Sequence, residues 1–186
     1  RRRRRAAEAY RERAAAANAE QAALEQWAVD LQLAEDRTAI DAVHDALVAG
    51  GYLPRGRGRP APVGQPLVVF SSDGLRMLVG RNSRQNEQVT FERSARGDLW
   101  LHARDVPGGH VVIKAAGREV PEATLREAAA IAAWYSGARS DGHVEVAVTD
   151  IRNVRHLRGG GPGLVTYDHE WTVLVEPRSP RDLGLA

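Results

Sequence analysis

The stretch that decides the fold is Asp98-Leu-Trp-Leu-His-Ala-Arg-Asp-Val-Pro-Gly-Gly-His-Val-Val-Ile-Lys114. From Leu99 to Arg104, apolar side chains alternate with aromatic, polar or cationic ones, which is the period of a β-strand with one apolar face. Asp105-Val-Pro-Gly-Gly109 is typical of a tight turn, and a β-branched strand returns from His110. The stretch therefore predicts a hairpin whose second face displays a cluster: Trp100, His102, Arg104, Asp105 and His110.

Two interpretations of this cluster compete. In the structural one, Trp100 belongs to the core, the histidines are hydrogen-bonded and Asp105 caps the turn. In the functional one, the aromatic and imidazole rings stack on bases while Arg104 meets phosphate, as in many RNA-binding surfaces. The residues of the hairpin alone leave both open.

Composition sets the broad class. The chain has 186 residues, of which 43% are hydrophobic and 27% charged, as in one folded domain with an appended element. It has no cysteine, which excludes disulfides, thiolate zinc sites and cysteine nucleophiles. No apolar run approaches the ~20 residues of a membrane span, and no signal peptide is recognisable. We expect a cytoplasmic protein without a membrane partner and, because residue 1 is not methionine, a fragment of a longer one.

The arginines are concentrated in three places although the net charge is only +2. They occupy residues 1–13, the segment from Arg55 to Arg59, and the segment from Arg152 to Arg158. Such clusters fit an RNA or ribosome partner, but they fit a solvated charged surface equally well.

The chain divides into four segments. Residues 1–50 contain no proline, and no glycine before Gly50, and they predict a helical coiled-coil arm with a break near Asp36. The arm's partner helix is expected in the missing part of the longer protein. Residues 51–65 read as a basic Gly/Pro linker, residues 66–177 as the globular domain, and residues 178–186 as a loose tail.

Within residues 66–177 the pattern predicts an α+β fold, with a largely antiparallel mixed sheet and one main packed helix. Strands are expected near 67–70, 75–79 and 144–148, the helix from Pro121 to about Ala138, and a hairpin from segments 164–167 and 171–175. The polar segment 80–87 either leads into a short helix or contacts phosphate through four side chains: Arg81, Asn82, Gln85 and Asn86.

Catalytic and cofactor patterns are missing from the sequence. There is no Gly-x-Ser-x-Gly or His-Glu-x-x-His motif, and no Gly-Lys-Ser/Thr follows the glycines of segment 159–163. A metal on His102, His110 and Asp105 lacks a further ligand, and a hydrolase built on Ser71 or Ser136 lacks an assembled base. We expect neither an enzyme nor a cofactor.

Several of these segments together resemble the NFACT-R domain, which closes proteins of the NFACT family. The resemblance rests on the central stretch, on Ser71–Gly74, on Val79–Asn82 with Gln85-Asn86, and on Ala132-Ala-Trp-Tyr-Ser-Gly-Ala-Arg139. It covers nearly all of residues 68–177, and the first fifty residues resemble the returning arm of the family's coiled coil. Gly109 departs from the family, which often has serine there.

The resemblance implies a role in ribosome quality control. Family members bind stalled large ribosomal subunits that still carry peptidyl-tRNA, and support tRNA recruitment for mRNA-independent alanine tailing. The NFACT-R domain is implied to contact RNA, with rRNA and tRNA as partners, and not to catalyse. By matching motif, the RNA-binding candidates are Arg81, Asn82, Gln85, Asn86, Trp100, His102, Arg104, Asp105, His110 and Arg139.

The chain departs from the NFACT family in one respect, and the resemblance also suggests one alternative function. The family's N-terminal domain, which selects tRNA, is absent from this chain, so we expect RNA binding without tailing. The rival is a protein-interaction or adhesion module, because some family members are called fibronectin-binding proteins.

Overall fold

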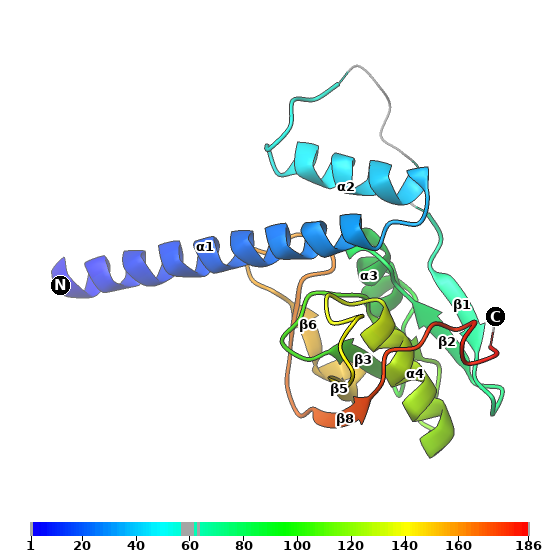
Figure 1. The fold of residues 1–186 in the computed structure, drawn as a ribbon. Coiled ribbons are helices and arrows are strands. Elements are labelled where there is room, and N and C mark those ends of the chain that lie inside the picture. Colours follow the sequence, from blue (N-terminus) through cyan, green and yellow to red (C-terminus); the bar gives the residue numbers. More distant parts are fainter. Residues whose placement is uncertain (1, 57–61, 63, 186) are drawn as a thin grey trace.

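Two helices precede a sheet-centred domain in the computed structural model, which describes residues 2–56, 62 and 64–185 (Figure 1). The predicted linker is thus described only in part, and its arginines Arg57 and Arg59 lie outside the described residues. Helix α1 (Arg2–Gln32) projects well beyond the domain at its N-terminal end, and α2 (Arg37–Ala49) turns back above it (Figure 1). The long N-terminal helix fits the predicted arm.

The break between the two helices lies where the sequence predicts it. Asp36 caps α2, since its carboxylate accepts a hydrogen bond from the Ala39 amide at 2.8 Å. The far end of α2 is held to α1 by the edge-on contact of Tyr52 with Trp27, whose ring centroids are 6.0 Å apart. Alanine, glutamate and arginine dominate the outer part of α1, whose side chains at residues 3–18 are exposed except at Ala14.

The domain is built on one six-stranded sheet in which every pairing is antiparallel. The strand order is β1-β2-β4-β3-β5-β8. The strands are β1 (Leu67–Phe70), β2 (Arg76–Val79), β3 (Leu99–Ala103), β4 (Val111–Ile113), β5 (Val144–Asp150) and β8 (Trp171–Val175). The α+β prediction is confirmed, and the central stretch supplies β3 and β4 at the middle of the sheet.

Helix α4 (Glu122–Trp134) covers one face of the sheet (Figure 1). Its alanines, from Ala128 to Ala133, are buried and let the helix approach Leu101, Ile113 and Val148 closely. Segment 178–185, predicted to be loose, also contacts this core through Leu183 and Leu185. It forms a turn in which the Leu185 amide donates to the Pro180 carbonyl at 2.8 Å.

A second layer covers the opposite face of the sheet. It consists of α3 (Ser83–Glu87), a π-helix (Gln88–Glu92), a 3₁₀ turn (Ile151–Asn153) and the two-stranded sheet of β6 (Val154–His156) and β7 (Val165–Tyr167). These elements bury Trp100 completely, among Leu78, Val89, Val112 and Val154. The expectation that β3 displays Trp100 on an open face is therefore wrong, because the second layer closes that face.

The predicted hairpin of segments 164–167 and 171–175 is also wrong. Strand β7 pairs with β6, Tyr167 opposite Val154, whereas β8 pairs with β5, Trp171 opposite Val148. The intervening corner takes a left-handed backbone angle at His169 (φ +55°) and carries the chain from one sheet to the other. The sequence predicts the two strands, but pairing with distant segments decides their partners.

Candidate functional site

The turn between β3 and β4 is clamped from two sides. The fully buried Asn86 donates from Nδ2 to the Gly108 carbonyl at 3.0 Å and accepts from the His110 amide through Oδ1 at 2.9 Å. Gln26 of α1 donates to the same carbonyl and accepts from the Gly108 amide, each at 3.2 Å. The turn therefore joins α3, the sheet and the arm in one hydrogen-bonded unit.

The glycines of this turn are required by close backbone approach. A Cβ on Gly108 would lie 2.7 Å from the Cβ of Ser136, and one on Gly109 would overlap the carbonyl oxygen of Gly80. The Gly109 amide donates to the Tyr135 carbonyl at 2.6 Å. Serine at position 109, which the NFACT resemblance leads one to expect, would need the backbone to shift here.

The polar segment 80–87 is mostly occupied with internal contacts. Asn82 caps α3, since its Oδ1 accepts from the Gln85 amide at 3.0 Å, and Gln85 in turn accepts from the Arg81 amide at 3.1 Å. Asn82 and Gln85 are buried, while the half-buried Arg81 guanidinium lies 3.6 Å from Glu35 of the arm. These side chains shape the junction between arm and domain.

The sequence does not single out two residues of this junction, Gln26 and Asp30. Asp30 of α1 is 2% exposed and accepts from Gln26 at 2.8 Å and from the Ser83 amide at 2.9 Å. Burial raises the pKa of Asp30 to about 6, although both hydrogen bonds act in the opposite direction. The available signal was a polar pair spaced i, i+4 beside the apolar Trp27 and Val29 of the helix.

Three aromatic rings surround Trp100 on its closed face. His102 lies nearly parallel to it at 5.6 Å between centroids, His110 lies edge-on at 5.0 Å, and Tyr167 lies tilted at 4.9 Å. The buried His110 also shares a hydrogen bond with Thr90 at 2.8 Å. Trp100 and His110 therefore belong to the core, as the structural interpretation has it. His102 and Tyr167 remain half-buried at the edge of this cluster.

Both histidines are held neutral by their surroundings. Burial lowers the pKa of His102 to about 4, against a hydrogen bond with the Gly108 backbone that acts upward. The pKa of His110 lies well below its ordinary value because of burial and of the neighbouring His102. Neither imidazole therefore carries a charge for a phosphate near neutral pH.

A crevice of about 250 Å³ opens where the arm meets this aromatic edge. We call it the arm crevice. Its lining residues are Ala22, Glu25, Gln26, His102, Asp105, Val106, Pro107, His110, Gly163, Leu164, Val165 and Tyr167. It brings the exposed Asp105 and half-buried His102 of the central stretch to one place, with side chains from α1 and β7 that the sequence did not suggest.

Two exposed arginines are neighbours, along the chain or across a strand pair, of segments that line the arm crevice, and we call them the basic rim. Arg104 follows β3, with 44% of its side chain exposed, and its Nε lies 3.6 Å from Asp105. Arg155 of β6 has 62% of its side chain exposed and contacts Asp168, the residue after Tyr167, at 3.0 Å. The charges of Arg104 and Asp105 also act on the pKa of Tyr167, which burial raises above its ordinary value.

Comparison with known proteins decides the family. A family model described as the NFACT protein RNA binding domain matches residues 66–166. The chain belongs to the NFACT family. It is 43% identical over 143 residues to the Rqc2 homolog RqcH of Bacillus subtilis (strain 168), which covers 74% of this chain and 25% of the relative. It is 36% identical over 152 residues to the Rqc2 homolog RqcH of Streptococcus suis (strain 05ZYH33), covering 80% and 27%.

A solved structure resembles the same region and the arm. It is the C-terminal part of the fibronectin/fibrinogen-binding protein from Streptococcus suis, with a TM-score of 0.82 and 32% sequence identity. The likeness covers 90% of this chain and 68% of that one. The chain spans about a quarter of the length of the RqcH relatives that it matches.

The ten candidate residues of the NFACT-R domain differ in how exposed they are. Five are buried in the scaffold: Asn82, Gln85, Asn86, Trp100 and His110. Arg104 and Asp105 are exposed, while Arg81, His102 and Arg139 are intermediate. The guanidinium of Arg139 lies 3.6 Å from the ring centroid of Trp134, on which it stacks.

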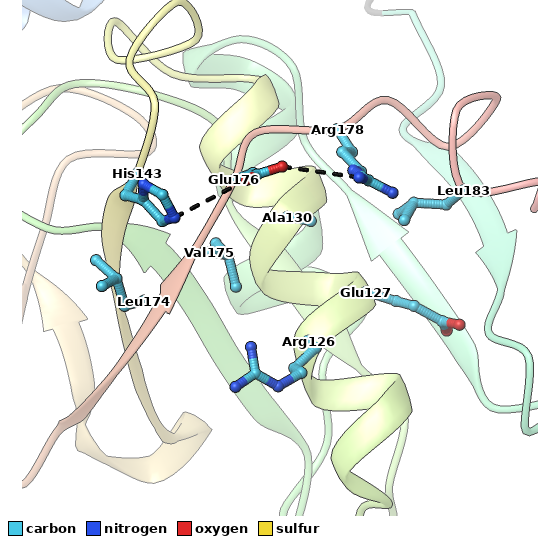
Figure 2. A pocket seen from close by; sticks show the side chains of 9 residues that line it. All are labelled: Arg126, Glu127, Ala130, His143, Leu174, Val175, Glu176, Arg178 and Leu183. Carbon is cyan, nitrogen blue, oxygen red and sulfur yellow. Dashed lines mark ion pairs between the residues drawn. The ribbon is translucent and has the colours of Figure 1, made fainter.

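A larger cavity of about 390 Å³ lies on the α4 side of the NFACT-R domain (Figure 2). Glu176 lies between His143, at 3.9 Å, and Arg178, at 3.7 Å, so Arg178 already has an anionic partner (Figure 2). The other lining residues are Arg126, Glu127, Ala130, Leu174, Val175 and Leu183. None of the nine belongs to the candidate set.

Two further searches concern metals and membranes. Across residues 2–56, 62 and 64–185, no group of three or more histidine, aspartate or glutamate side chains is placed to hold a metal ion. The described helices include none with the length and hydropathy needed to cross a membrane.

Proposed function

We propose that this chain is the RNA-binding module of a ribosome quality control factor. It acts in the cytoplasm on stalled large ribosomal subunits that carry peptidyl-tRNA, and supports tRNA recruitment for mRNA-independent alanine tailing without catalysing a step itself. The observation that carries the proposal is the match of residues 66–166 to the NFACT RNA-binding domain. The RqcH relatives support its place in quality control.

The ten candidate residues then take two kinds of role in this proposal. The buried ones hold the turn and the aromatic cluster in shape. Arg104 of the basic rim contacts phosphate together with Arg155, while His102 and Asp105 face the RNA at the arm crevice. Arg81 and Arg139 add positive charge near the junction of arm and domain, and the arginines of the outer arm add non-specific attraction.

The arm belongs to the same proposal. The outer side chains of α1 are exposed, including 74% of Tyr10, so this part of the helix is free to pack against another helix. We infer that the partner is the other arm of the coiled coil, from the remainder of the longer protein.

The test is binding of the chain to purified large ribosomal subunits and to tRNA over a salt series. We expect affinity to fall steeply with salt, because each neutralised phosphate releases condensed counterions. Binding absent at low salt, or unchanged between low and high salt, would contradict the proposal. The chain alone should not restore tailing to cells that lack the full-length factor.

A second candidate function is binding of an extracellular-matrix protein. It is favoured by the name of the similar Streptococcus suis structure and by apolar side chains exposed on the two edge strands. These are Val68 and Phe70 on β1, and Trp171 and Leu174 on β8. Immobilised fibronectin in the same salt series separates the two, since an interface of this kind would depend little on salt.

A further inference from the structure

We propose that the arm crevice receives one unpaired nucleobase that carries an amino group, with cytosine as the simplest case. The inference rests on the proposed RNA-binding function and says which part of the RNA enters the domain. The phosphates of that nucleotide and its neighbours lie outside, on the basic rim.

The size of the arm crevice suits a single planar group. Its volume of about 250 Å³ is below the roughly 300–1,000 Å³ of pockets that take drug-sized ligands. Its walls come from three places: Glu25 and Gln26 of α1, Val106 and Pro107 of the turn, and a third segment of Gly163, Leu164, Val165 and Tyr167. A flat ligand held there would contact arm and domain together.

The inner wall offers rings for stacking. His102 and Tyr167 line the crevice, both are half-buried, and both are backed by the buried Trp100. Burial keeps His102 uncharged, so its ring acts as a neutral aromatic surface and not as a phosphate ligand. Aromatic rings of this kind stack on any base, because every base has a π-face.

The charges of the arm crevice select among ligands. Glu25 and Asp105 line it and both are exposed, so they repel a phosphate from the interior. Glu25 accepts from Gln21 through Oε1 at 2.9 Å, and no described residue donates to its Oε2. A free carboxylate oxygen accepts from the amino group of cytosine, whereas uracil presents a carbonyl at the same place.

The basic rim supplies the phosphate contact of the proposed nucleotide site. Arg104 lies 3.6 Å from the Asp105 carboxylate, so a phosphate on Arg104 and a base beside Asp105 can belong to one nucleotide. Outside the crevice the Arg104 guanidinium also lies 3.7 Å from Glu145, and 44% of its side chain stays exposed to a phosphate. Carboxylates inside the crevice and an exposed guanidinium outside it suit a base extruded from a single strand or loop.

The experiment compares short oligocytidylate and oligouridylate of equal length, binding to the whole 186-residue chain at fixed salt. The two bases share ring size and differ in the amino group. We expect oligocytidylate to bind about five-fold more tightly, which is the order of one good base contact. The double variant Glu25→Gln with Asp105→Asn should lose this preference, because amides both donate and accept.

Three further variants serve as controls. Asparagine tolerates the left-handed backbone of position 105 (φ +56°), so the double variant keeps the fold. Glu12→Gln, on the outer part of the same helix, should keep the preference. Tyr167→Ala should weaken both oligomers about ten-fold and Tyr167→Phe should not, if stacking on that ring is real.

The outcomes are distinct. Equal affinity for both oligomers, or a preference that survives in the double variant, overturns the inference and leaves RNA binding intact. Binding of an arginine-rich peptide that is lost in the double variant, beside equal affinities for the oligomers, assigns the crevice to a basic peptide instead and also overturns it. No salt-sensitive binding to either oligomer overturns the proposed function itself.

Discussion

At the scale of single residues, Trp100 shows how a functional motif and a structural one can look alike. It stands in a strand beside two histidines and an arginine, as a stacking residue would, yet the second layer of the domain buries it completely. Three rings pack around it, so its bulk organises the aromatic cluster instead of meeting a base directly.

Trp100→Ala should lower the free energy of unfolding by about 3–5 kcal/mol, because it leaves a large cavity in the second core. Denaturant unfolding followed by circular dichroism measures the change. Trp171→Ala is the matched control, since Trp171 is 46% exposed and its loss should cost less than about 1 kcal/mol. Similar losses in the two variants would contradict the assignment of Trp100 to the core.

His102 should remain neutral over the physiological range. Its pKa of about 4 reflects burial, so its imidazole resonances should stay constant from pH 8 to about pH 5 and titrate near pH 4. Histidine-selective NMR measures this directly, with the exposed His169 as an internal comparison. A midpoint near 6.5 for His102 would mean that the ring is solvated and available as a cation.

At the scale of elements, the junction of α1 with the domain buries a carboxyl group, which costs stability when that group is ionised. Asp30 is buried there with two hydrogen bonds, and its pKa is raised to about 6 from 3.8. Between these values the folded state holds a proton that the unfolded state has lost. Stability contributed by this group is therefore present at low pH and decreases as the pH rises to about 6.

Asp30→Asn isolates this effect, because every other titratable group is the same in the two proteins. Between pH 4 and pH 7, the free energy of unfolding of the wild type should fall by about 2 kcal/mol relative to the variant, since the shift is about two pKa units and the unfolded carboxyl is already partly ionised at pH 4. Urea unfolding at several pH values gives the difference. A difference independent of pH would show that Asp30 is not buried as a carboxyl group.

Local pattern predicted most elements but not their partners. The absence of glycine and proline, the capping residue Asp36 and the alternation of β3 gave helices and strands where they occur. The layer over Trp100 and the separation of β7 from β8 depend on contacts between distant segments, which periodicity does not encode. For the same reason the sequence does not single out Gln26, Asp30 or Tyr167 as residues of the candidate site.

At the scale of the whole molecule, the residues of the NFACT motif fix the position of the arm relative to the sheet, and so the position of the arm crevice relative to the basic rim. The clamped turn fixes the arm against the sheet through Gln26 and Asn86. That geometry places the arm crevice next to Arg104 of the basic rim, on the face opposite α4. A helical arm and a domain joined in this way can present one continuous surface to a large RNA.

The most direct test of the central claim is the salt dependence of tRNA binding for the chain and two variants. Arg104→Gln with Arg155→Gln should reduce the slope of log affinity against log salt by about 1.5, at roughly 0.7–0.9 for each lost phosphate contact. Arg126→Gln, an exposed arginine of α4 on the other side of the sheet, should leave the slope unchanged. If the double variant keeps the wild-type slope, or the control loses as much, the RNA does not lie on the basic rim.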